Sequence, residues 1–190
     1  MMELPPEVQA TLLDRRVVFL RGRLDEATAN ATIAQLLLVG RLADGKPVEL
    51  YVDSPGGALG AALSVYDVLR SLSAPVATTC LGTAGGAAVL ILAAGALGRR
   101  FALPHARIHL ADDPVDLAGG RPPSVADAAE QVSQLRTRWI AALAGHTAHS
   151  AEHIGRDLAA GRWLSAAEAR DYGLVDGIIP GAPAGRPGRF

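Results

Sequence analysis

The sequence predicts an α/β fold built on parallel strands, and three observations lead to that prediction. Short β-rich runs alternate with longer runs that have helical periodicity. Gly-rich turns follow two of the predicted strands, at the position where parallel α/β folds carry their sites. The 190 residues are 49% hydrophobic but only 4% aromatic, which suits one domain whose core consists mainly of Ala, Val, Leu and Ile.

The first part of the chain supplies the alternating elements. Apolar and polar residues alternate in one predicted strand, and Asp25 is placed to cap the first predicted helix. The turn after the second strand reads SPGG, and the turn after the third reads TAGGA, which opens a buried helix. We therefore expect strands at 16–22, 47–53, 75–82 and 100–111, with helices at 25–40 and 58–72.

A long helix is predicted over about 124–145. Ser124 caps its first turn, with Asp127 three residues later as in a capping box. Its apolar positions are separated by steps of three and four in turn, which is typical of a helix that pairs with a helix outside its own domain. An ordinary amphipathic helix is the alternative. The positions are Val125, Ala128, Val132, Leu135, Trp139 and Ala142.

The C-terminal part carries a second capping box, Ser165 with Glu168, which predicts a short helix. A Gly-stopped helix end and a short strand follow it within 172–179. Residues 180–190 are rich in Pro and Gly, and we expect them to form a flexible tail. The folded domain is therefore expected to span residues 1–179.

Charge and hydropathy exclude several classes of function. The formal net charge is −1, which argues against binding of nucleic acid or of an anionic membrane, because both need a basic face. The Arg pairs at 15–16 and 99–100 are expected at solvated ends of elements. The apolar run at 87–97 is shorter than the roughly 20 residues of a membrane span. No secretory signal is seen at the start, so a cytoplasmic location is expected.

Candidate metal ligands are few, and neither a metal nor a cofactor is expected. Three histidines follow helical spacing, but only Glu152 and Asp157 lie close to them, which favours a polar surface. The single cysteine, Cys80, stands in an apolar run and is expected to pack as a small hydrophobic residue. The three histidines are His146, His149 and His153.

Four ordered segments resemble the ClpP peptidase subunits: DRRVVFLRG, ANATIAQLLL, YVDSPGG followed by SVYDVL, and RWLSAAEARDYGLVDGII. The resemblance runs from about residue 8 to residue 179. The SPGG turn on its own also occurs in related crotonase-like folds. The resemblance implies a ClpP/crotonase-like fold in which the helix at 124–145 is a protruding handle. It also implies assembly into two stacked seven-membered rings.

The resemblance places the family's catalytic triad on residues that lack the required side chains. The nucleophilic Ser falls on Gly86, the His on Ala111 and the Asp on Gly161. A hydroxyl needs a base to remove its proton and the base needs a carboxylate to orient it, so these positions cannot support the family's chemistry. The family's two oxyanion-hole donors, which are backbone amides, fall on Gly56 and Ala87.

These observations predict a non-catalytic ClpP-like subunit with a structural or regulatory role. The alternative is a hydrolase or crotonase-like enzyme with a rewired site that uses the donors at Gly56 and Ala87. His109 is its candidate base, because it lies two residues before Ala111 and so points to the same face of a strand.

The expected partners follow from the family's assembly. Copies of this chain, active ClpP subunits, or both are expected in heptameric rings, with Leu135 and Trp139 at the contact between two rings. Tyr51 matches an aromatic residue of the cleft where a Clp ATPase docks. Glu49 stands where the family prefers an apolar side chain, which makes direct docking of the ATPase doubtful.

Overall fold

A mostly parallel sheet forms the centre of the computed structural model, which describes residues 5–40, 45–113 and 124–180. Within these residues seven strands run in the order β1-β2-β3-β4-β7, while β5 pairs with both β3 and β6. The predicted α/β class with parallel strands is confirmed. The strands are β1 (Val17–Arg21), β2 (Val48–Ser54), β3 (Val76–Gly85), β4 (Arg100–Ala102), β5 (Arg107–Leu110), β6 (Arg162–Ser165) and β7 (Gly177–Ile178).

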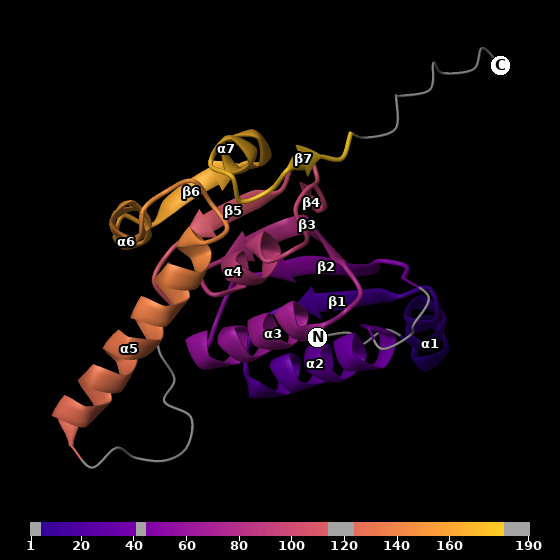
Figure 1. Cartoon of the computed structure of the whole chain (residues 1–190), viewed down its shortest axis with the longest axis horizontal. Coiled ribbons are helices and arrows are strands. Elements are labelled where there is room, and N and C mark those ends of the chain that lie inside the picture. Colours follow the sequence, from indigo (N-terminus) through magenta and orange to yellow (C-terminus); the bar gives the residue numbers. More distant parts are fainter. Residues whose placement is uncertain (1–4, 41–44, 114–123, 181–190) are drawn as a thin grey trace.

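Helices pack around the sheet, and one of them leaves the body of the molecule (Figure 1). Helices α2 and α3 lie side by side, while α4 is completely buried. The predicted handle is α5, which projects from the body. The helices are α1 (Pro6–Asp14), α2 (Glu26–Gly40), α3 (Leu59–Ser71), α4 (Ala88–Ala93), α5 (Val125–Ala144), α6 (Ala151–Ala159) and α7 (Ala166–Asp171).

Three of the predicted helix starts agree with the structure because each depends on a local side-chain cap. Asp25 Oδ1 accepts a hydrogen bond of 2.8 Å from the Thr28 amide. Ser124 caps α5, and Ser165 forms the complete capping box that begins α7. Such caps satisfy amides that have no partner inside the helix. The segment 114–123 and residues 181–190 of the expected tail lie outside the described residues.

The predicted strand at 100–111 is two strands in the structure. The first part of β3 pairs with β4, and its last residues, Thr83–Gly85, pair with β5. A turn between them places β5 against the carboxyl end of β3, where the amide of Gly86 donates to the carbonyl of His109 at 2.9 Å. Strand β6, which the sequence pattern did not reveal, then pairs antiparallel with β5.

The second member of each Arg pair is buried, so the expectation of solvated element ends is wrong for Arg16 and Arg100. Their side chains and backbone together are 5% and 6% exposed. Arg16 Nη1 donates to the carbonyl of Val39 at 3.1 Å. Buried guanidinium groups are tolerated only when protein acceptors replace water, and both residues have such acceptors.

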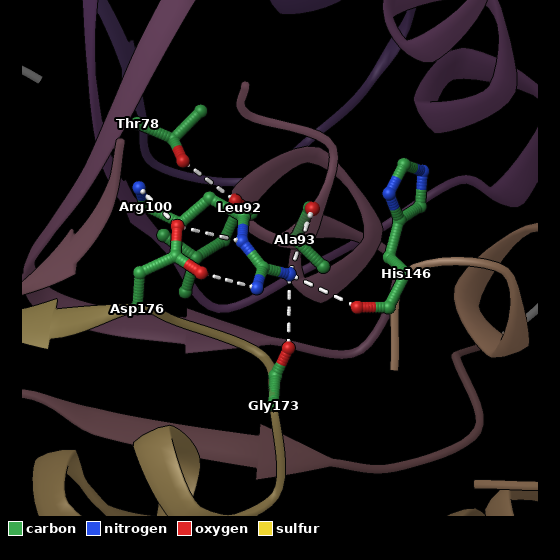
Figure 2. Close-up of polar contacts among 7 residues, drawn as sticks. All are labelled: Thr78, Leu92, Ala93, Arg100, His146, Gly173 and Asp176. Carbon is green, nitrogen blue, oxygen red and sulfur yellow. Dashed lines mark hydrogen bonds and ion pairs between the residues drawn. The ribbon is translucent and has the colours of Figure 1, made fainter. Parts of the chain in front are cut away.

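Arg100 joins three chain segments, two of which are distant from it in sequence (Figure 2). Its Nε and Nη2 atoms donate to the carboxylate of Asp176 at 3.0 and 2.5 Å. Its Nη1 donates to three carbonyls that follow or end α4, α5 and α7, at 3.5, 3.0 and 2.9 Å. These belong to Ala93, His146 and Gly173. The base of α5 is therefore fixed to the body by a buried charge as well as by apolar packing.

The described residues contain no helix long and apolar enough to cross a membrane. The buried side chains form one continuous cluster, to which α4 and the inward faces of β1, β2 and β3 contribute. Aliphatic side chains dominate this cluster, as the composition predicts.

Candidate functional site

Two glycine-containing turns meet at the carboxyl ends of β2 and β3, where the sequence placed the site. Ser54, at the end of β2, pairs with Ala84 near the end of β3, after a shift in register between Val52 and Ser54. The SPGG turn continues from one strand, and Gly86–Ala87 continue from the other into α4. Parallel strands bring such ends to one edge of a sheet, so two stretches 30 residues apart face each other.

The carboxylate of Asp113 lies between the two turns. Its Oδ2 atom accepts hydrogen bonds from the amide of Gly57 at 2.9 Å and from the amide of Ala87 at 2.5 Å. Of the two predicted donors, Ala87 is therefore one of the converging amides. The amide of Gly56, the other predicted donor, donates to Ser54 Oγ at 3.2 Å, and the second amide that converges on Asp113 is that of Gly57.

The carboxylate fits there because two neighbouring residues have no side chain. A Cβ atom built on Gly86 or on Gly56 would collide with the carboxylate of Asp113. Gly86 also has a φ of +44° and Gly56 a φ of +104°, conformations that residues with a Cβ rarely adopt. A serine at position 86 and the observed position of Asp113 are therefore mutually exclusive.

The other two triad-like positions lie at the end of the β5–β6 ladder. The last antiparallel pair is Leu110 with Arg162, and Ala111 and Gly161 are the next residues on the two strands. The structure thus brings Ala111 and Gly161 together as the resemblance implies. Neither has a side chain that can accept or donate a proton.

His109, the candidate substitute base, has its ring between Trp163 and the Gly161 position, where its Nε2 atom lies 3.8 Å from a Cβ atom built on Gly161. Its ring stacks on Trp163, with the ring centroids 4.0 Å apart and the planes inclined by 8°. Within the described ranges its ring forms no hydrogen bond, whereas its backbone carbonyl accepts from Gly86. The backbone of His109 therefore contacts the turn at Gly86, while its imidazole lies beside Gly161 and is held by stacking on Trp163.

Two of the nearby groups, the hydroxyl of Thr78 and the thiol of Cys80, are engaged or unreactive. Thr78 Oγ1 donates to the carbonyl of Leu92 at 2.6 Å. Burial, together with the charge of Asp53, raises the pKa of the Cys80 thiol to about 12. A thiol with that pKa is protonated at neutral pH and is a poor nucleophile.

Comparisons with known proteins give the same family as the sequence motifs. The family described as Clp protease matches residues 5–182. The chain belongs to the Clp protease family. It is 41% identical over 171 residues to an ATP-dependent Clp protease proteolytic subunit-like protein of Streptomyces coelicolor, covering 90% of this chain and 81% of that protein.

Two further Clp protease relatives are similar over most of the chain. Proteolytic subunit 4, chloroplastic, of Arabidopsis thaliana is 38% identical over 175 residues, which are 92% of this chain and 60% of that protein. Proteolytic subunit 2 of Corynebacterium diphtheriae is 36% identical over 181 residues, which are 95% of this chain and 90% of that protein.

The two residues expected at a ring contact have different surroundings. Trp139 is only 1% exposed within the single chain, and its Nε1 donates to the carbonyl of Ala87 at 3.5 Å. The Trp139 side chain is thus already buried inside the single chain, and its expected place at a ring contact stays a prediction. Leu135, one turn earlier on α5, is half-buried and remains a candidate for such a contact.

The position that resembles part of the Clp ATPase-docking cleft is polar in this chain. The Tyr51 hydroxyl donates to Glu49 Oε2 at 3.0 Å, and the Tyr51 ring stacks on Phe19. Burial and the neighbouring carboxylate raise the pKa of Tyr51. An apolar docking peptide would have to displace or cover the Glu49 carboxylate, which is unfavourable.

The histidines near α6 contact one another and aromatic rings. His149 and His153 stack with centroids 4.5 Å apart, and His153 Nε2 lies 3.2 Å from Asp157. Burial of His146, followed by the charges of Arg70 and Arg100, lowers the pKa of its imidazole. Across residues 5–40, 45–113 and 124–180, no group of three potential ligands is arranged to hold a metal ion.

Asp113 is the site residue that sequence reasoning missed. It stands in the stretch DDPVDLAGGRPP, whose Gly, Pro and Asp content predicts a loop. A signal for its role was present: a carboxylate follows the end of a predicted strand beside a position that lacks the family's imidazole. Its target could not be read from the sequence, because the target consists of backbone amides.

Proposed function

We propose that this Clp protease family member is a non-catalytic subunit of the Clp proteolytic complex. Its role would be structural or regulatory, in a ring made of its own copies or in a mixed ring with active subunits. The observation that carries the proposal is the carboxylate of Asp113 on the amides of Gly57 and Ala87. In acyl transfer, such amides serve to stabilise a negatively charged oxygen.

A resident carboxylate opposes that use for two physical reasons. It takes up the hydrogen bonds that a developing oxyanion would need, and its own charge repels a second negative charge nearby. The substitutions at Gly86, Ala111 and Gly161 add to this argument, since no nucleophile, base or orienting acid stands at the triad-like positions. The same resident charge counts against the alternative of a crotonase-like or rewired hydrolase.

The catalytic part of the proposal is tested with a serine-directed fluorophosphonate and fluorogenic peptide and ester substrates. An active Clp subunit from the same source serves as the positive control. We expect no labelling and no hydrolysis above a buffer blank. Stoichiometric labelling of any serine, or turnover that His109→Ala abolishes, would overturn the non-catalytic assignment.

The assembly part is tested by co-expression with that active subunit, followed by affinity purification and native mass spectrometry. A defined stoichiometry in a ring-sized complex supports the mixed ring, and a ring-sized mass for the chain alone supports the homomeric ring. A monomer under both conditions would contradict assembly. As a partner of Clp subunits the chain would share their compartment, which we propose is the cytoplasm.

A further inference from the structure

Two backbone amides and one carboxylate form the most unusual polar arrangement outside the buried Arg100 network. The amides of Gly57 and Ala87 come from separate turns, and both donate to Oδ2 of Asp113. Hydrogen bonds to an ionised carboxylate are about twice as strong as those between neutral groups. The cradle is small, because only the missing side chains of Gly56 and Gly86 leave room for a planar carboxylate.

The carboxylate of Asp112, the residue before Asp113, connects the site formed by the Gly57 and Ala87 amides to helix α5. Asp112 Oδ1 and Oδ2 accept from Nε and Nη2 of Arg136 at 2.8 and 3.0 Å, a two-point contact with α5. Both side chains are more than one-third exposed, so this ion pair alone contributes little stability. Its position is informative, because it anchors the residue that precedes Asp113.

A second path leads from the cradle to the same part of α5. Trp139 lies three residues after Arg136, on the same face of the helix, and its Nε1 donates to the carbonyl of Ala87. Ala87 is therefore held at its amide by Asp113 and at its carbonyl by α5. Asp113 contacts Ala87, Ala87 contacts Trp139, and Arg136 on the same helix contacts Asp112, which precedes Asp113 in the chain. These contacts form a closed series.

We infer that the amides of Gly57 and Ala87 form a binding site for a small monocarboxylate, and that the Asp113 side chain is the ligand that occupies this site. Occupancy of the site is coupled to α5 through Arg136 and Trp139. The inference rests on the proposed non-catalytic role, since an active subunit would need these amides for a substrate oxyanion. The ligand class follows from the group that occupies the site, a carboxylate, and from the two amides that donate to one of its oxygens.

The first experiment empties the site and refills it. Asp113→Ala removes the carboxylate but keeps Cβ, so formate has the size of the group that is lost. The thermal midpoint should fall by about 3–10 °C. Formate should then raise it saturably in Asp113→Ala, whereas the parent protein should not respond. Chloride at equal ionic strength and the larger anion propionate are the matched controls.

Trp139 reports the coupling, because it becomes the sole tryptophan in a Trp163→Phe background. In that background, Asp113→Ala should shift the Trp139 emission to the red, and formate should reverse the shift. Arg136→Met should also weaken the coupling, so its effect on the thermal midpoint and that of Asp113→Ala should not be additive. Additive effects would overturn the coupling.

Further outcomes decide the remaining cases. A formate response that is equal in the parent and in Asp113→Ala, or no saturable response in the variant, would overturn the carboxylate site. If Asp113→Ala does not fold, Asp113→Asn replaces it, because its amide oxygen keeps one acceptor while losing the charge. Asp113→Asn should lower the thermal midpoint by less than the roughly 3–10 °C expected for Asp113→Ala. An unchanged midpoint would overturn the role of Asp113.

The failure of this inference and that of the proposed function are distinguishable. Fluorophosphonate labelling of the parent protein would contradict the non-catalytic role whatever formate does to Asp113→Ala. Absence of labelling together with absence of a formate response would leave the non-catalytic role supported and would overturn the carboxylate site alone.

Discussion

Replacement of Trp139 by alanine separates a core residue from a subunit-contact residue. Trp139 is 1% exposed, and a buried aromatic side chain removes some 150–250 Å² from water. At roughly 25 cal/mol per Å², that area corresponds to about 4–6 kcal/mol. Measured Trp→Ala substitutions in cores cost about 3–5 kcal/mol, and we expect a loss of unfolding free energy in that range for Trp139→Ala.

The assay is urea unfolding followed by far-ultraviolet circular dichroism at two protein concentrations. A core residue changes the stability of the subunit by the same amount at both concentrations, whereas a contact between subunits contributes more at the higher one. Leu135→Ala is the matched control, since Leu135 is half-buried on the same helix. It should cost about 1 kcal/mol or less in the dissociated subunit.

A cost below about 1 kcal/mol for Trp139→Ala would refute the reasoning, because no fully buried indole is removed so cheaply. A cost that appears only at high protein concentration would also refute it and would place Trp139 at a contact between subunits. If the alanine variant does not fold, Trp139→Phe tests the same point with a smaller cavity and a smaller expected loss.

Three further predictions follow from the polar contacts. The Gly86→Ser variant should remain unlabelled by a fluorophosphonate, and its thermal midpoint should fall because its Cβ collides with the Asp113 carboxylate. Adding Asp113→Gly should recover part of the lost midpoint, and labelling of the single variant would contradict the prediction. Burial alone would raise the pKa of Asp176, but hydrogen bonds from Arg100 and its charge outweigh burial, so the pKa lies below its usual 3.8. The stability that the Arg100–Asp176 pair contributes is therefore fully present above about pH 4 and is lost as the pH falls through the pKa of Asp176 in the folded state. When the unfolding free energy is measured against pH in acid, Asp176→Asn should remove this part of the pH dependence. An unchanged pH profile would disprove the prediction. Cys80 should react with a thiol reagent only upon unfolding at pH 8, since burial raises its pKa to about 12; rapid reaction of the native protein would contradict its burial.

Much of the fold could be predicted because its signals are local. Caps at Asp25, Ser124 and Ser165 set helix starts through contacts three residues away, and the sequence alone displays such contacts. The alternation at 47–53 likewise predicted β2. The split of the run at 100–111 into β4 and β5 could not be predicted, since it depends on which part of β3 each segment pairs with.

The burial of two arginines and the contacts of Asp113 with backbone amides could not be predicted from local sequence patterns. Arginines are mostly exposed in proteins, so residue type alone placed Arg16 and Arg100 in solvent, and only the positions of distant carbonyls explain their burial. The triad-like positions could be located from motifs, and the structure brings Ala111 and Gly161 together. The role of Asp113 depends on amides, which every residue except proline possesses.

The shared space at positions 86 and 113 has an evolutionary consequence. A serine introduced at position 86 alone would be forced against a carboxylate that is already bound, so this single substitution would lower the stability of the protein. Losing Asp113 first would leave two amides without their acceptor. Positions 86 and 113 are therefore expected to change together among relatives, because a side chain at position 86 requires a smaller or displaced side chain at position 113.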